Sequence, residues 1–118
     1  TLFIFGYKGK QVRDNIHSYD VVSAFDEFIK KPKTGGCVYN LGGGRINSCS
    51  ILEAINLIEN ISEVKSKYKV LKQNRIGDHI WWITDNSKLK KDYPNWKIKY
   101  SLNKSLEQMI EFEYNQKK

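Results

Sequence analysis

The sequence predicts a mixed α/β (α+β) fold with a small sheet and about four helices. Short runs of β-branched and aromatic residues, typical of strands, alternate with longer stretches in which apolar residues recur every three or four positions, as on one face of a helix. The chain has 118 residues, which is enough to bury one core. We therefore expect a single domain over residues 1–118.

The first third of the chain predicts two strands and a helix. Residues 1–5 form a β-branched and aromatic run, and a glycine turn followed by alternation over residues 11–16 indicates a hairpin. Ser18 is the expected N-cap of a helix that ends before Pro32. The apolar stripe of this helix comprises Val21, Val22, Phe25, Phe28 and Ile29. Because the chain opens on a strand-like run without a methionine, we expect it to be a piece of a larger protein.

The rest of the chain predicts further short strands and three helices. Residues 37–41 are expected to form a short buried strand that ends at the glycines 42–44, and residues 68–71 a second one. Ser50 and Glu53 have the spacing of a capping box and start a helix. Residues 74–83 are irregular or partly extended. A short helix capped by Asp85 with Asn86 and Ser87 ends before Pro94, residues 96–100 are extended, and Leu102 opens a last amphipathic helix.

The charge balance favours an anionic partner. Lysine and arginine number 20 against 13 acidic residues, a formal net charge of +7. Nucleic acid, a phosphorylated small molecule and an acidic protein surface all fit, and so does the plainer explanation that the lysines maintain solubility. The lysines lack the regular aromatic interleaving of RNA-binding proteins, which argues against nucleic acid.

Cysteine usage and hydropathy narrow the class of protein. Cys37 and Cys49 lack a CxxC spacing, so we expect neither a disulfide framework nor a metal site, and a cytoplasmic location fits. The apolar runs are far shorter than the roughly 20 residues that cross a bilayer, so we expect no membrane association.

Two arginines are the strongest candidates for ligand binding. Arginine is rare beside lysine here, and its planar fork binds phosphate oxygens two at a time. Arg13 lies in QVRDN and Arg75 in NRIGDH, where Gly77 gives local backbone freedom and Asp78 can fix a guanidinium or accept a ribose or sugar hydroxyl. Taken alone, an arginine is more often an ordinary surface or structural residue.

The remaining motifs are ambiguous by themselves. The triple glycine in YNLGGGRINS matches neither GxGxxG nor a P-loop, so a tight turn is favoured over a ligand border. His17 and His79 have no nucleophile at a telling spacing, and we assign no catalytic residue. Trp81, Trp82, Trp96 and Tyr93 can stack a base, but packing is the commoner role of such residues.

Three segments together resemble a known family. RDNIHSYDVVSAF resembles the RDxIHVxDxxxA segment in the carboxy-terminal half of extended short-chain dehydrogenase/reductases that act on nucleotide sugars, and VYNLGGGRINSCSILEAI resembles their YNLGxGxxxS turn. RIGDHIWWITDNSKLKKDYPNWK resembles their RxGDxxxxxxDxxKAxxxLGW segment, with Leu89 for alanine and one extra residue before Trp96. The likeness covers nearly the whole chain in the same order.

This resemblance implies the carboxy-terminal, substrate-binding region of an NAD(P)-binding Rossmann-type enzyme of carbohydrate biosynthesis. By this likeness Arg13 and Arg75 hold the pyrophosphate of a nucleotide-diphosphate sugar, Asp78 and His79 lie at the pocket edge, and Asn47 reaches the nucleotide. NAD would bind the family's amino-terminal half, which also carries the catalytic tyrosine and lysine. We expect this chain to bind no cofactor or metal and to be inactive alone.

The implied reaction of the intact enzyme is epimerisation: NAD oxidises a ring carbon to a transient ketone and returns the hydride on the other face. A dehydratase or decarboxylase of the same family is an open alternative, and so is a small basic module that binds nucleic acid or another polyanion. Apolar surface normally covered by the other half is expected to drive homo-oligomerisation.

Overall fold

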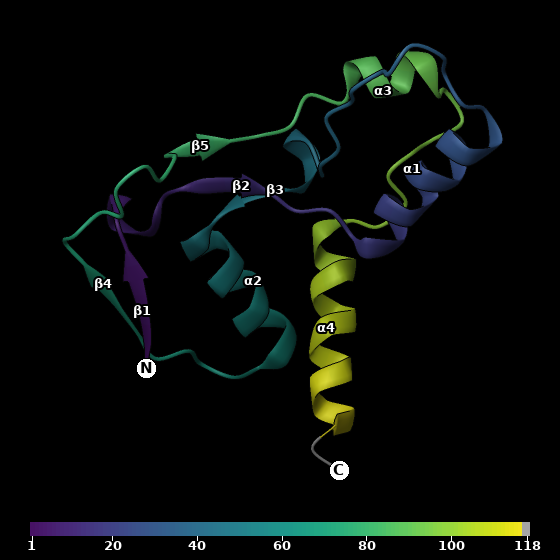
Figure 1. The fold of residues 1–118 in the computed structure, drawn as a ribbon. Coiled ribbons are helices and arrows are strands. Elements are labelled where there is room, and N and C mark those ends of the chain that lie inside the picture. The colour runs from purple at the N-terminus through teal and green to yellow at the C-terminus, as the bar shows by residue number, and fades with distance from the viewer. Residues whose placement is uncertain (117–118) are drawn as a thin grey trace. The chain divides into compact units, whose positions relative to one another are not determined.

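The computed structural model describes residues 1–116, which divide into two compact units (Figure 1). The first unit comprises Thr1–Arg13, Cys49–Trp82 and the chain from Asn103 onward; the second comprises Asp14–Ser48 and Ile83–Leu102. The four predicted helices and small sheets are present, which confirms the mixed α/β class. The single domain stays a prediction. No helix within residues 1–116 is long and apolar enough to cross a bilayer.

Parallel strand pairs replace the predicted hairpin in the first unit. Strand β1 (Leu2–Phe5) pairs in parallel with β4 (Tyr68–Leu71), and β2 (Val12–Asp14) pairs in parallel with β5 (Trp81–Trp82) in a sheet of order β3-β2-β5, where β3 is Ser48–Ser50. The hairpin was wrong because the 3₁₀ turn η1 (Tyr7–Gly9), with left-handed residues from Gly6 to Gly9, sends the chain into a different sheet.

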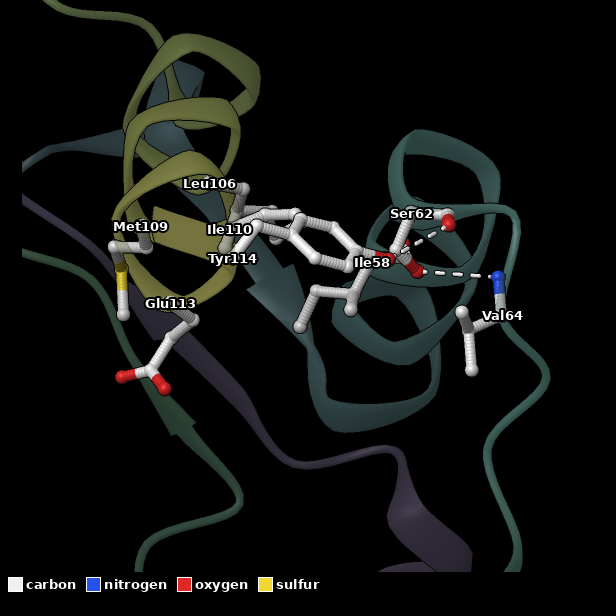
Figure 2. Close-up of a pocket in the computed structure, with 8 residues that line it drawn as sticks. All are labelled: Ile58, Ser62, Val64, Leu106, Met109, Ile110, Glu113 and Tyr114. Atoms are coloured by element: carbon white, nitrogen blue, oxygen red, sulfur yellow. Dashed lines mark hydrogen bonds between the residues drawn. The ribbon is translucent and has the colours of Figure 1, made fainter. Parts of the chain in front are cut away.

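Two helices complete the first unit. Helix α2 (Ile51–Ser62) begins at the predicted capping box: the Glu53 N–H donates to Ser50 Oγ at 3.2 Å, and the Ser50 N–H donates to Glu53 Oε2 at 2.7 Å. Helix α4 (Leu102–Gln116) is the predicted last helix. Ile4 and Ile55 are the buried aliphatic residues of this unit. Helices α2 and α4 together line an apolar pocket (Figure 2).

The second unit opens with α1 (Ser18–Lys30), whose N-cap is His17 and not the predicted Ser18. The Nδ1 atom of His17 accepts the Tyr19 N–H at 3.0 Å. The His17 ring stacks on Tyr100 with centroids 4.1 Å apart, which holds the imidazole at the helix start. The capping residue therefore lies one position earlier than the serine.

Helix α1 buries only part of its predicted apolar stripe, since Val21 and Phe28 are half-buried and the other three residues are exposed. Asp20 and Ala24 are fully buried, whereas Val22, Phe25 and Ile29 are 53–79% exposed. The Asp20 carboxylate accepts the backbone N–H groups of residues 99 and 100, so the polar side chain turns the helix toward that segment. The core of this unit contains Ala24, Leu89, Tyr93 and Trp96, with Ile16, Phe28, Tyr39, Leu41 and Ile98 packed against it.

Two predicted extended segments of the second unit are not strands. Residues 37–41 and 96–100 join no sheet, and the first of them is largely exposed rather than buried. Tyr39 is fixed by its hydroxyl, which donates to Asp92 Oδ2 at 2.7 Å. Between these segments, α3 (Ser87–Asp92) confirms the predicted short helix. Its N-cap is Asn86, one of the predicted capping residues, and Asp85 Oδ1 accepts the Ser87 N–H at 2.9 Å. Both segments are thus held by side-chain contacts instead of ladders.

Candidate anion-binding site

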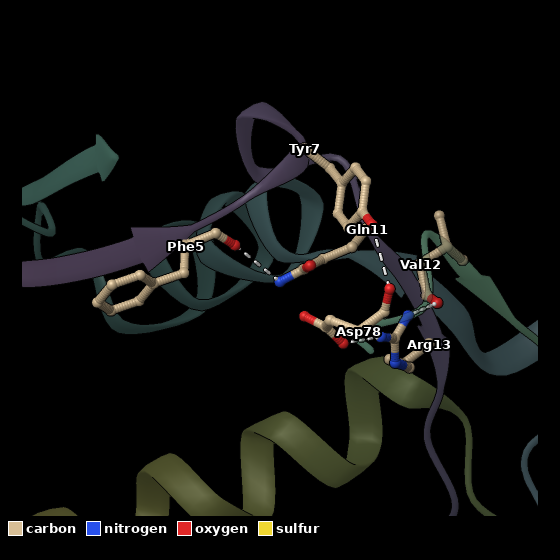
Figure 3. A network of polar contacts seen from close by, with 6 residues as sticks. All are labelled: Phe5, Tyr7, Gln11, Val12, Arg13 and Asp78. Atoms are coloured by element: carbon tan, nitrogen blue, oxygen red, sulfur yellow. Dashed lines mark hydrogen bonds and ion pairs between the residues drawn. The ribbon is translucent and has the colours of Figure 1, made fainter. Parts of the chain in front are cut away.

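An ion pair joins two of the predicted site residues in the first unit. Arg13 Nη2 lies 2.7 Å from Asp78 Oδ1, while Arg13 Nη1 donates to the carbonyl of Val12 at 2.7 Å (Figure 3). The Arg13 side chain is 36% exposed and that of Asp78 is 24% exposed. The guanidinium is therefore held in one plane by two acceptors while part of it faces solvent, which suits an arginine that binds anions.

Arg75 and Asp78 are the ends of one tight turn. The Asp78 N–H donates to the Arg75 carbonyl at 3.3 Å, and Gly77 between them has φ +77°. A turn of type II requires a positive φ at its third residue, and glycine supplies this without strain. The spacing R-x-G-D thus has a local cause, because the glycine allows the turn that carries both charged residues.

Arg75 itself is exposed and lies over an aromatic ring. Its guanidinium carbon is 5.1 Å from the centre of the Phe5 ring, within the range of a cation–π contact. No residue between 1 and 116 forms an ion pair with Arg75. Of the two predicted arginines, Arg13 is matched by a carboxylate and Arg75 carries the unmatched positive charge.

Tyr7 contacts the pair from the amino-terminal side, and Gln11 lies two residues before Arg13. The Tyr7 hydroxyl donates to the Asp78 carbonyl at 3.1 Å, and Gln11 Nε2 donates to the Phe5 carbonyl at 3.4 Å (Figure 3). Gln11 and Arg13 are two residues apart at an extended strand, so their side chains share a face. Gln11 Oε1 is buried without a hydrogen-bond partner among the described residues.

Trp82 is the residue that sequence reasoning left unassigned. In the parallel β2–β5 pair, Arg13 is opposite Trp82, whereas Val12 is opposite Trp81. Opposed residues in such a ladder project to the same face, and neighbours along a strand project to opposite faces. Trp82 is 55% exposed. The predicted site residue His79 lies against it, with ring centroids 4.9 Å apart. The register that identifies Trp82 is not readable from the sequence.

Asn47 lies in the second unit and makes its own set of contacts. It is 3% exposed; its Nδ2 donates to the Tyr100 carbonyl at 3.0 Å, and its Oδ1 accepts the Leu102 N–H at 3.0 Å. These bonds hold the loop after the glycines against residues 100 and 102 of the same unit. Ligand contact by Asn47 stays a prediction.

The triple glycine is packed against protein. A Cβ on Gly43 would lie 1.8 Å from the Asn15 carbonyl oxygen, and one on Gly42 would lie 2.2 Å from Thr84 Oγ1. The space left by the missing side chains is occupied by Asn15 and Thr84 of the same unit. The residues of this loop therefore do not fit the pyrophosphate of NAD.

The described residues offer no metal site or catalytic pair either. No group of three His, Cys, Asp or Glu side chains within residues 1–116 could hold a metal ion. In the family that the motifs resemble, the catalytic tyrosine and lysine lie four positions apart on one helix. Among the described residues, no tyrosine shares a helix with a lysine four positions on. Lys118, which follows Tyr114 at this spacing, lies outside the described residues. The site in the first unit is suited to binding an anion.

Comparisons of sequence and of structure with known proteins found relatives of this chain. CDP-paratose 2-epimerase of Salmonella typhi is 29% identical over 111 residues, which are 93% of this chain and 32% of that protein. UDP-glucuronic acid 4-epimerase from Bacillus cereus, solved with UDP-glucuronic acid and NAD, matches with a TM-score of 0.82 and 27% identity over 97% of this chain and 35% of that one.

The chain is related to nucleotide-sugar epimerases and dehydratases. A dTDP-glucose 4,6-dehydratase from Bacillus anthracis, solved with NAD, also matches, with a TM-score of 0.77 and 26% identity over 98% of this chain and 35% of that one. No protein-family model matches the chain. The chain spans about a third of the length of these relatives. The mixed α/β fold expected from the motifs is therefore that of part of these enzymes.

Proposed function

We propose that this chain is the substrate-binding part of an NAD-dependent nucleotide-sugar epimerase and that its first unit binds the diphosphate of the substrate. The observation that carries the proposal is the 2.7 Å pair between Arg13 and Asp78. It brings the RD motif of β2 and the RxGD turn together, although the two lie 65 positions apart. Two separate motifs that meet in one polar cluster favour a shared ligand over two unrelated surface charges.

The roles of the two arginines differ. Arg75, which has no carboxylate partner within residues 1–116, supplies net positive charge to the ligand phosphates. Arg13 is oriented by Asp78 and by the Val12 carbonyl, which fixes the direction of its guanidinium at the site. Asp78 keeps a carboxylate oxygen that can accept a hydroxyl of ribose or sugar, and Trp82 supplies an exposed ring on the face of Arg13. These residues position a substrate, and the chain itself provides no redox step.

A cytidine diphosphate sugar is the substrate we propose, because the curated relative is a CDP-paratose 2-epimerase. NAD would supply the transient oxidation in the intact enzyme, held by residues other than those described. A dehydratase reaction on a similar substrate is the second candidate, supported by the dehydratase among the structural matches.

Isothermal titration of the chain with CDP and UDP tests the binding role. We expect Arg75→Ala and Arg13→Ala each to weaken nucleoside diphosphate binding about 10- to 150-fold, the loss of a hydrogen bond to a charged group of about 1.5–3 kcal/mol. Arg45→Ala is the matched control, because Arg45 is exposed and belongs to the second unit.

Equal binding by wild type and all three variants would contradict the assignment of the arginines. Binding of oligonucleotides that falls steeply with salt, together with no CDP binding, would instead favour the basic polyanion-binding module. Tighter binding of CDP than of UDP would support a cytidine diphosphate sugar as the substrate. Equal binding of the two would support only the more general proposal of a nucleotide-diphosphate sugar.

A further inference from the structure

The positive charge of the chain is concentrated in the first unit around β1 and β4. Residues 1–13 and 65–77 hold eight of the 20 basic residues and none of the 13 acidic ones, so the rest of the chain is close to neutral. The two segments lie side by side because β1 and β4 form a parallel ladder (Figure 1). The ladder therefore gathers charges that are far apart in the sequence.

Most of these charges are not compensated by carboxylates. Arg13 pairs with Asp78 at 2.7 Å and Lys65 pairs with Glu59 at 2.9 Å. The other six are exposed and form no ion pair within residues 1–116: Lys8, Lys10, Lys67, Lys69, Lys72 and Arg75. A cluster of this size attracts anions, and polyanions most strongly.

The two faces of the β1–β4 ladder differ. Ile4 is 3% exposed, and Tyr68, which projects to the same face, lines a pocket together with residues of α2. Helix α2 therefore covers this face. Phe3 is opposite Lys69 in the ladder, and both project to the other face, as does Phe5 two positions on. Phe3 is 55% exposed.

The outer face combines aromatic rings with cations. The Arg75 guanidinium carbon lies 5.1 Å from the centre of the Phe5 ring, while Phe3 is exposed beside Lys69. The Lys67 carbonyl accepts the N–H of residue 2 at 2.8 Å, which continues the ladder and puts Lys67 two positions before Lys69. Single-stranded nucleic acids stack their bases on such rings and guanidinium planes, and cations contact their backbone. A duplex hides the faces of its bases, and an acidic peptide has none.

We propose that the outer face of the β1–β4 ladder binds single-stranded nucleic acid, with a base stacked on Phe3 and phosphates beside Lys67 and Lys69. This activity is additional to diphosphate binding, since these three residues belong to neither the RD nor the RxGD motif. The lysines lack aromatic interleaving along the sequence, but the ladder supplies it, because β1 provides the rings and β4 the lysines.

Fluorescence anisotropy with labelled oligo-dT and oligo-U of about 12 nucleotides tests the proposal, since such sites span about 4–16 nucleotides. We expect saturable binding that weakens as salt is raised, and the tighter of the two strands identifies DNA or RNA as the ligand. An abasic oligomer and a duplex of the same length are expected to bind at least about fivefold more weakly, because neither offers an open base to Phe3.

Variants of the face separate stacking from charge. Phe3→Ala is expected to weaken oligo-dT binding about 5- to 150-fold, whereas Phe3→Trp retains it. Phe112→Ala is the matched control, because Phe112 lies on α4 and is 60% exposed. Lys69→Gln is expected to reduce the salt slope by about 0.7, and Lys33→Gln, which removes an exposed lysine of the second unit, leaves it unchanged.

Three results would each overturn the proposal: equal binding of the abasic oligomer and oligo-dT, equal effects of Phe3→Ala and Phe112→Ala, or complete displacement of oligo-dT by saturating CDP. The last would mean that the oligonucleotide occupies the nucleotide site. CDP binding is expected to be unchanged in Phe3→Ala, so this proposal and the proposed function can fail independently.

Discussion

Asp20 allows a quantitative test of what holds the second unit together. The residue is 0% exposed, and its carboxylate accepts the backbone N–H of Lys99 at 2.9 Å and that of Tyr100 at 3.1 Å. Hydrogen bonds to a charged group contribute about 1.5–3 kcal/mol each. Asp20→Ala leaves both N–H groups without an acceptor, so we expect it to lower the free energy of unfolding by about 4 kcal/mol.

Asp20→Asn is the more informative change because it preserves shape. The amide retains one acceptor oxygen and turns an NH₂ group toward the second N–H donor. We therefore expect Asp20→Asn to lower the free energy of unfolding by about 2 kcal/mol, the contribution of one such hydrogen bond. Total stabilities of about 5–15 kcal/mol make both losses measurable. Urea unfolding followed by tryptophan fluorescence is a suitable assay, since Trp96 Nε1 donates to the Asp20 carbonyl at 3.0 Å.

The control is Asp26→Asn on the same helix. Asp26 is exposed and pairs with Lys30 one turn on, so its replacement is expected to leave the unfolding midpoint unchanged. If Asp20→Asn and Asp26→Asn unfold at the same urea concentration, the buried carboxylate does not anchor residues 96–100 and the reasoning is refuted.

Three further predictions concern the turn, the capping box and the proposed site. Gly43→Ala is expected to lower the melting temperature by several degrees, because the added Cβ would lie 1.8 Å from a backbone oxygen; an unchanged melting temperature would contradict the packing role. Hydrogen bonds from Ser50 lower the pKa of Glu53 below its ordinary value of 4.5, so the capping box stabilises above about pH 4.5 and that contribution is lost as the pH falls through the lowered pKa. Denaturation between pH 3 and 6 should show a smaller pH dependence in Glu53→Gln. Trp82→Leu should weaken CDP-sugar binding about three- to tenfold and Trp81→Leu should not, since the two side chains project to opposite faces; equal effects would remove Trp82 from the site.

Local signals in the sequence predicted the elements that depend on neighbouring residues. The Ser50–Glu53 spacing located the start of α2, because both partners of a capping box lie within one turn. Gly77 in the RxGD motif indicated local backbone freedom, and its φ of +77° in the turn from Arg75 to Asp78 uses that freedom. The motif likeness also supplied Arg13 and Asp78 as site residues, but their ion pair joins positions 65 apart and was not predicted.

The sequence did not reveal which strands pair across long distances in the chain. An apolar run before η1 and alternation after it are equally compatible with a hairpin and with two parallel ladders, since a strand pattern fixes the faces of a strand and not its partner. The partners β4 and β5 lie more than 60 residues away. The position of Trp82 opposite Arg13 follows from that register alone.

What the sequence determined by itself was the set of helices, the capping of α2 and the family likeness, because these rest on contacts within a few residues or on short motifs. Only the tertiary structure decided which face of α1 is buried and why Gly43 is a glycine. Asp20 faces inward because the backbone of residues 99 and 100 needs an acceptor, and Gly43 is required because the Asn15 carbonyl lies against it. In both cases the cause is a backbone group far away in the sequence, namely the N–H groups of residues 99 and 100 or the Asn15 carbonyl. No local sequence pattern reveals such a contact.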